Sequence, residues 1–171
     1  MDIIKQELLN HKENPIIDKS DALELFKIYH DSIEKVAEKR QKANSYFLTL
    51  NTGIIAIIGF LFQKDTSSDL KMLHFLLPAA GIISGIYWYQ LVVSYRQLNK
   101  GKFAVLNIIE EYLPLAPYKA EWKELGEGKD KKKYNPLTHT EQRIPIVFII
   151  LYSILSFYFF YLLLKDSNVF C

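Results

Sequence analysis

The stretch IPIVFIILYSILSFYFFYLLL, residues 144–164, decides the fold class, because its 21 residues carry no charge. At 1.5 Å per residue, a helix of this length is about 31 Å long, which matches the hydrocarbon thickness of a bilayer. An uncharged run of about 18 or more residues indicates a transmembrane helix. We therefore predict that residues 144–164 cross a membrane.

Two further stretches have the same character. Residues 72–95, MLHFLLPAAGIISGIYWYQLVVSY, are also uncharged. Residues 46–62, YFLTLNTGIIAIIGFLF, are at the lower limit of length for a span and include Asn51. For 46–62 a core helix of a soluble protein is the alternative. The sequence predicts an all-α integral membrane protein with about three transmembrane helices.

The basic residues test this interpretation independently. Eight lysines and arginines precede the first span, two lie between the first and second, ten lie between the second and third, and one follows the third. Since three spans alternate sides, eighteen of the 21 basic residues fall on one side, as the positive-inside rule requires. We expect residues 1–45 and 96–143 in the cytoplasm and the short tail 165–171 outside.

The expected cytoplasmic regions have helical patterns. Residues 20–45 have amphipathic spacing and no Gly or Pro, so this helix should continue directly into the first span. The helix of the second span should extend through 94–113, although Gly101 weakens it. The loop 126–136 contains Lys129, Lys131, Lys132 and Lys133. These lysines are either solvated or in contact with anionic headgroups.

Composition argues against several functions. A net charge of +2 gives no reason to expect direct nucleic-acid binding. The one cysteine, Cys171, allows neither a disulfide nor a cysteine metal site within the chain, and the four histidines have no metal-ligand spacing. No known catalytic motif is present. We therefore expect no enzymatic activity, no cofactor and no bound metal.

Polar and small residues inside the spans are the candidates for function. Asn51 either lines a pore or forms a hydrogen bond between helices. Gly81 and Gly85 form a G-x-x-x-G pattern, which allows close packing either within one protomer or between protomers. Trp88 lies in an aromatic cluster where the second span ends, and the simplest interpretation is anchoring at the membrane interface. The other members of this cluster are Tyr87, Tyr89 and Tyr95.

One pattern is more specific. It reads Trp88-x6-Tyr95-Arg96-x-Leu98-Asn99-x-x-Lys102-Phe103, then Glu110/Glu111, Leu113-Pro114, Glu121-Trp122 and Arg143-Ile-Pro145. Over roughly residues 80–150 the chain resembles the RipA-like family of octameric bacterial inner-membrane proteins. That family is related to an accessory pore protein encoded beside RNA-targeting CRISPR nucleases of type VI-B. The resemblance implies a homo-octameric ring in the inner membrane, with such a nuclease as a partner acting upstream in antiphage defence.

Charged residues follow the second span closely. If the chain turned at Gly101, Arg96 and Lys102 would meet Glu110 and Glu111 in a compact set. This set would be either ordinary ion pairs or a lock between protomers. The complete set of candidate pore or assembly residues is Asn51, Gly81, Gly85, Trp88, Tyr95, Arg96, Asn99, Lys102, Glu110 and Arg143. The expected function is a pore that alters membrane permeability, and the alternative is a non-conducting scaffold or regulator that supports envelope integrity or intracellular survival.

Overall fold

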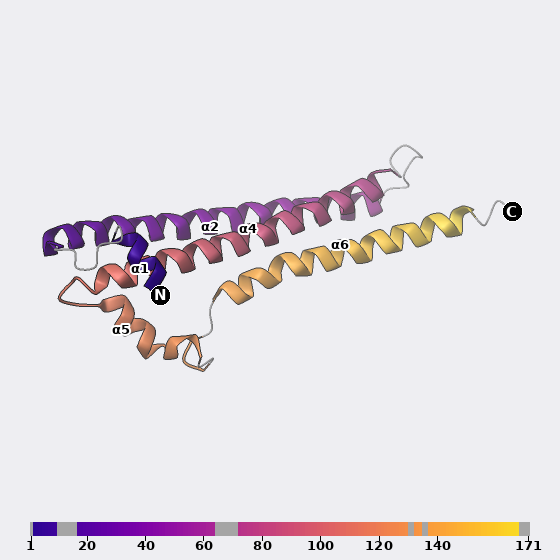
Figure 1. Ribbon diagram of the computed structural model, residues 1–171. Coiled ribbons are helices and arrows are strands. Elements are labelled where there is room, and N and C mark those ends of the chain that lie inside the picture. Colours follow the sequence, from indigo (N-terminus) through magenta and orange to yellow (C-terminus); the bar gives the residue numbers. More distant parts are fainter. Residues whose placement is uncertain (1, 10–16, 64–71, 130–131, 135–136, 168–171) are drawn as a thin grey trace. The chain divides into compact units, whose positions relative to one another are not determined.

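The computed structural model describes residues 2–9, 17–63, 72–129, 132–134 and 137–167 (Figure 1). Its elements are α1 (Asp2–Leu8), α2 (Lys19–Phe62), α4 (Leu73–Glu110), α5 (Pro117–Glu124), the short 3-10 helix η1 (Gly126–Gly128) and α6 (Leu137–Ser167). Within these ranges every regular element is a helix, which confirms the all-α prediction. Residues 168–171, with Cys171 and the end of the predicted outer tail, lie outside the described residues.

Within the described residues, three helices are long and apolar enough to cross a membrane. They are Lys19–Phe62, Leu73–Glu110 and Thr140–Lys165, so the prediction of three spans is confirmed. The amphipathic segment 20–45 and the first span form one helix of 44 residues, as expected from the absence of Gly and Pro at their junction.

The chain divides into two compact units. The charged unit comprises Met1–Arg40 and Ser94–Leu137, and the apolar unit comprises Gln41–Val93 and Thr138–Cys171. Only nine of the 40 charged residues belong to the apolar unit. The boundaries fall inside α2 and α4, so each of these helices contributes a segment to both units.

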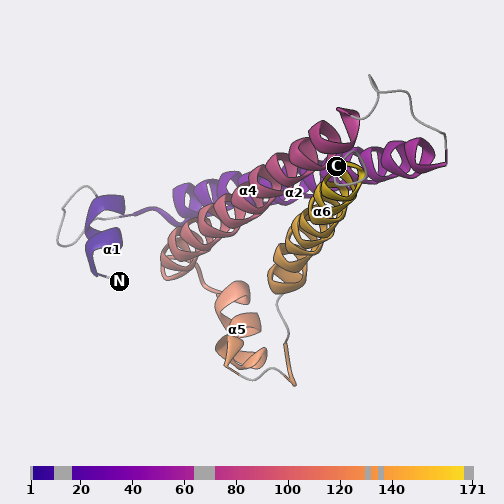
Figure 2. The same ribbon diagram turned by 90° about the vertical axis from the view of Figure 1, so that its right-hand side faces the viewer.

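In the apolar unit, α2, α4 and α6 form a three-helix bundle. Both views show α2 and α4 side by side (Figures 1 and 2). Asn51 of α2 contacts Ser84, and Asn44 contacts Trp88, so α2 and α4 are antiparallel. Ile58, Tyr152 and Phe159 form the core, with Phe159 and Tyr152 supplied by α6. At most 28% of the residues in any apolar window are buried, so lipid or neighbouring copies must cover the rest.

In the charged unit, the beginning of α2 packs with the end of α4, and α1 and α5 are attached to them. Its buried apolar side chains are Ala22, Ile33, Leu106, Ile108 and Ile109. Gly101 does not end or turn α4, which continues to Glu110. A glycine inside a helix costs only about 1 kcal/mol relative to alanine, which the buried residues that follow readily offset. The turn considered at Gly101 is therefore wrong.

Candidate assembly and pore residues

Asn51 is a polar residue at the centre of the apolar unit. It is 0% exposed. Its Nδ2 donates to the carbonyl oxygen of Phe47 at 2.8 Å and to Oγ of Ser84 on α4 at 3.1 Å. The backbone carbonyl oxygen of Asn51 accepts a hydrogen bond from the hydroxyl of Tyr152 on α6 at 2.9 Å. These contacts support the helix-bonding interpretation, and the pore-lining interpretation of Asn51 is wrong, because no part of the side chain reaches the surface of the protomer.

Trp88 is also buried, at 1% exposed. Its indole Nε1 donates to Oδ1 of Asn44 at 2.9 Å. Its ring stacks on Phe47 at 5.9 Å and meets Phe148 at the same centroid distance. A side chain so enclosed cannot contact headgroups, so interfacial anchoring is the wrong interpretation for Trp88. Its neighbours Tyr87 and Tyr89 are exposed and remain candidates for that role.

The two glycines of the G-x-x-x-G pattern face α6 of the same chain. A Cβ on Gly81 would overlap the ring of Tyr152, and a Cβ on Gly85 would lie 2.6 Å from Cγ1 of Ile149. Small residues at these positions let α4 and α6 approach closely. Of the two interpretations in the sequence analysis, packing within one protomer therefore applies to both glycines.

A different face of α2 is exposed and carries only small or polar residues. Residues spaced by three or four positions share one side of a helix. On α2 such a series is exposed at every position and contains no large apolar side chain: Gln41, Ser45, Thr49, Thr52, Ala56 and Gly59. We call this series the α2 polar face. A Cβ on Gly59 would meet no atom within 4 Å. The spacing was readable in the sequence, but only the structure separates this face from the buried side of Asn51.

The surfaces of the other two spans differ. On α4 and α6 the exposed side chains of the apolar unit include many large apolar groups: Leu76, Ile83, Ile86, Val147, Ile150, Ile154, Phe157 and Phe160. Such side chains are suited to lipid contact. Large apolar side chains such as Ile57 flank the α2 polar face on the same helix. The α2 polar face is thus a narrow strip of small and polar residues flanked by large apolar side chains.

In the charged unit, Glu110 at the end of α4 holds the start of α5. It is 1% exposed. Its two carboxylate oxygens accept from the backbone N–H groups of Tyr118 at 2.8 Å and Lys119 at 3.0 Å. These N–H groups belong to the first turn of α5, where Pro117 has no N–H to satisfy. A carboxylate is favourable at this end of a helix, so Glu110 caps α5 from a neighbouring helix.

The compact set of Arg96, Lys102, Glu110 and Glu111 does not form. Along a continuous helix, Arg96 and Glu110 are separated by about 21 Å. Nζ of Lys102 donates instead to Oγ of Ser32 at 2.8 Å and lies 5.4 Å from the centroid of the Tyr29 ring.

Glu111 has partners of its own. Its carboxylate pairs with Lys5 of α1 at 2.7 Å and lies 3.9 Å from Nζ of Lys119 of α5. The two adjacent glutamates therefore attach α1 and α5 to the end of α4. This is an assembly role inside the charged unit that the spacing in the sequence did not reveal.

Tyr118 is the aromatic centre of the charged unit. Its ring lies 6.0 Å from Phe26 and 5.6 Å from Phe103, and its hydroxyl lies 2.6 Å from Nδ1 of His30. Burial, and then the negative charges of Glu121, Glu34 and Glu110, raise the pKa of Tyr118 above its usual range. Tyr118 therefore remains neutral at physiological pH.

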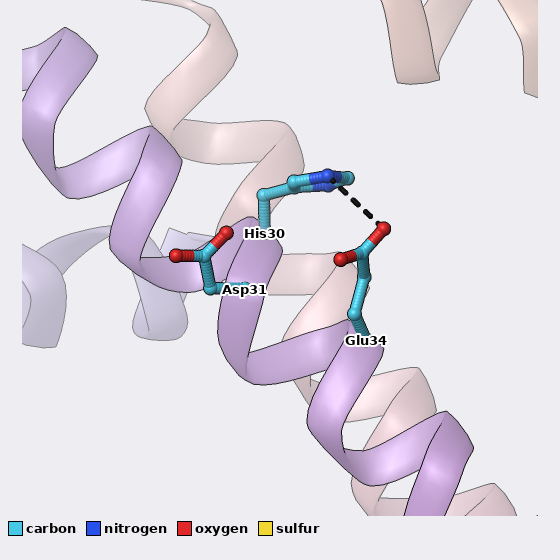
Figure 3. A group of neighbouring side chains, drawn as sticks. All are labelled: His30, Asp31 and Glu34. Atoms are coloured by element: carbon cyan, nitrogen blue, oxygen red, sulfur yellow. Dashed lines mark ion pairs between the residues drawn. The ribbon is translucent and has the colours of Figure 1, made fainter.

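His30, Asp31 and Glu34 lie close together on α2, with potential ligand atoms within 4.8 Å of one another (Figure 3). The histidine ring is already engaged on both sides. Its Nε2 lies 3.4 Å from Glu34, the dashed contact in Figure 3, and its Nδ1 meets the hydroxyl of Tyr118. Exposed acidic groups are common without an ion, so we assign no metal to this group. His30 holds α5 against α2 through its contact with Tyr118.

The remaining candidates are spread along two helices. Tyr95 is partly buried and Arg96 exposed on α4. Asn99, one turn later, has a buried Oδ1 without a hydrogen-bond partner among the described residues. Arg143 is exposed near the start of α6 in the apolar unit.

The bundle of three apolar helices defines a multi-pass membrane protein. A family model of the octameric membrane protein family matches residues 23–161, which include all three spans. The chain belongs to the octameric membrane protein family. No curated protein and no solved structure matches the chain. Family membership confirms the resemblance to octameric membrane proteins and supports self-association as a homo-oligomer.

Proposed function

We propose that the protein forms a homo-oligomeric pore in the bacterial inner membrane, with the α2 polar face turned toward the central axis. The observation that carries this proposal is the exposed series of small and hydroxyl-bearing residues on α2, which at membrane depth also exposes large apolar side chains such as Leu48, Ile57 and Phe60. Polar groups at membrane depth normally face protein or water, not lipid. Near the central axis of a ring of copies, such groups would face both neighbouring protomers and water.

The bundle geometry supports this orientation of α2. Gly81 and Gly85 of α4 are occupied by contacts with α6, so they are not available for a neighbouring copy. Asn51 is enclosed between the helices. The exposed strip of small and hydroxyl-bearing residues on α2 therefore remains available to water or to a second copy.

The resemblance to an accessory pore protein of CRISPR systems extends the proposal to a setting. The protein would act as a non-enzymatic effector of antiphage defence, downstream of an RNA-guided nuclease. Opening of the path would then alter the permeability of the inner membrane. The charged unit, with α1 and α5 held by Glu111 and Glu110, is the part suited to receiving such a signal.

A non-conducting scaffold is the second candidate, and one observation favours it. Ser45, Thr49, Thr52, Ala56 and Gly59 repeat with alternating steps of four and three residues. That is the spacing of a left-handed helix pair, and small residues favour close contact between membrane helices. If α2 helices of neighbouring copies packed tightly along this face, no water path would remain.

Cysteine accessibility distinguishes the two. In a Cys171→Ser background, single cysteines replace Thr49, Thr52 and Ala56 on the α2 polar face, and Ile57 and Phe157 provide lipid-facing controls. A charged, membrane-impermeant thiol reagent is applied to the protein in sealed vesicles, from each side. For a pore we expect modification at the first three positions but not at the controls, together with a change in ion flux.

The scaffold gives a different result. Thr49→Cys and Thr52→Cys would resist the charged reagent and would form disulfides between protomers under mild oxidation. A third outcome, no reaction with the reagent and no cross-link at any position on the α2 polar face, would contradict both proposals, because that face would then be in lipid.

A further inference from the structure

Directly after α5, the described residues form a tight turn that packs against α5. Gly126, Glu127 and Gly128 all have positive φ, at 70°, 55° and 72°, so the chain reverses tightly. Gly128 lies against the ring of Trp122, and a Cβ there would be 3.1 Å from Cη2. The reversal brings Tyr134 to Trp122, with ring centroids 6.4 Å apart in an edge-on arrangement.

This surface exposes both aromatic and basic groups. Trp122 is 45% exposed although Tyr134 lies against its ring, and Leu115 just before α5 is 77% exposed. Five exposed lysines accompany them: Lys119, Lys123, Lys129, Lys132 and Lys133. Three glutamates in the same segment leave an excess of positive charge. The ion pairs of Lys129 with Glu127 and of Lys133 with Glu124 are exposed, so they compete weakly with another anion.

The connection to α6 limits the distance of this surface from the bilayer. Lys133 precedes the start of the candidate span at Thr140 by seven residues. A chain of that length reaches at most about 25 Å when fully extended. The end of this segment therefore lies no more than about 25 Å from the start of the candidate span.

We propose that Trp122, Tyr134 and the lysines Lys129, Lys132 and Lys133 form a binding platform for anionic phospholipid headgroups of the membrane that α6 crosses. Tryptophan and tyrosine rings, with one apolar and one polar edge, favour the headgroup level. Lysine clusters next to a membrane span are attracted to anionic headgroups. The lysines provide attraction to anionic headgroups, and the aromatic rings favour a position at headgroup level. This inference does not depend on the proposed pore.

The fluorescence of Trp122 provides a direct test. The chain has two tryptophans, and Trp88 is buried, so the difference between the natural protein and its Trp122→Phe variant isolates Trp122. The full-length protein is reconstituted in vesicles of phosphatidylcholine and in vesicles with equal parts of phosphatidylcholine and phosphatidylglycerol. In the anionic vesicles we expect blue-shifted emission, at least about twofold weaker quenching by iodide, and quenching by lipids spin-labelled at the headgroup.

Charge variants complete the test. The triple change Lys129→Gln, Lys132→Gln and Lys133→Gln should remove the difference between the two lipids, as should high salt. The matched control removes three exposed lysines of the same unit: Lys27→Gln, Lys35→Gln and Lys39→Gln. Equal quenching in both lipids, or a lipid difference that survives the triple change, would overturn the proposal. Shielding of Trp122 even in detergent would also overturn it, since another protein surface would then cover the ring.

Discussion

The hydroxyl of Tyr152 on α6 donates a hydrogen bond of 2.9 Å to the carbonyl oxygen of Asn51 on α2, while its ring fills the space left by Gly81 on α4. One side chain therefore contacts all three helices of the apolar unit. Tyr152 is fully buried, as is Asn51. In a bilayer, where apolar contact with lipid replaces the hydrophobic drive between helices, close packing and such hydrogen bonds hold a bundle together.

The first prediction concerns Gly81. Gly81→Ala places a methyl group against the ring of Tyr152, and overpacking of this kind costs about 1–3 kcal/mol. We expect lower stability of the protomer in mixed micelles titrated with denaturing detergent, followed by circular dichroism. Gly101→Ala on the same helix is the control, because a Cβ there meets no atom within 4 Å.

A double-mutant cycle sharpens this prediction. In a Tyr152→Ala background the overlap is absent, so the cost of Gly81→Ala should largely disappear. If Gly81→Ala instead leaves the protomer stable and dissociates the oligomer, Gly81 lies at a contact between copies, and its assignment to α6 fails.

Asn51 provides a second prediction, which separates stability from permeation. Asn51→Ala removes the bond to Ser84, and such bonds in membrane bundles contribute about 0.6–1.7 kcal/mol. The neighbouring Thr52→Ala removes only a bond to Leu48 within α2 and lies on the α2 polar face. We expect Asn51→Ala to lower stability without altering ion flux per oligomer, and Thr52→Ala to alter flux with little loss of stability. If Asn51→Ala instead altered ion flux and Thr52→Ala lowered stability, Asn51 would line the pore.

The sequence predicted the spans well because hydropathy and charge are local properties. Residues 144–164 and the basic asymmetry needed no tertiary information. The contacts of the candidate site residues were harder to predict from the sequence. Trp88 lies in an aromatic cluster at the end of a span, which is typical of an interfacial anchor. Asn44, 44 residues earlier, instead accepts a hydrogen bond from its indole N–H and so permits its burial. The partner of Glu110 was also misjudged, since a hydrogen bond to backbone N–H groups leaves no trace in residue identity.

The two faces of α2 illustrate the same limit. Asn51 and Thr52 are adjacent polar residues in one span, and the sequence alone does not show which of the two is buried. In the bundle they lie on different faces of α2, Asn51 toward α4 and α6 and Thr52 on the exposed strip. Helical spacing groups residues into faces, but which face is buried depends on where the other helices pack.

The third prediction uses the titration of Tyr118. Its pKa is raised above the ordinary value of 10.0, chiefly by burial and then by nearby carboxylates. The charged unit therefore loses no stability from this group at neutral pH, and it loses stability as the pH rises above about 10. Tyrosinate absorbance of the natural protein minus that of Tyr118→Phe should give a midpoint above 10.0. Glu121→Gln should lower that midpoint, and a midpoint at or below the ordinary value would contradict burial of the hydroxyl.

The last prediction compares two adjacent glutamates. Glu110→Ala leaves the N–H groups of Tyr118 and Lys119 without their acceptor, which costs about 1–3 kcal/mol, or roughly 5- to 150-fold in an opening equilibrium. Hydrogen exchange of the amides of α5 should accelerate within that range. Glu111→Ala removes a charge of the same sign at the next position, but its partners Lys5 and Lys119 are exposed lysine side chains, whose pairs contribute about 0–1 kcal/mol. Its effect on α5 should be several-fold smaller, because Glu111 accepts no backbone N–H of that helix. Equal acceleration in the two variants would mean that charge alone, and not capping by Glu110, holds α5 to α4.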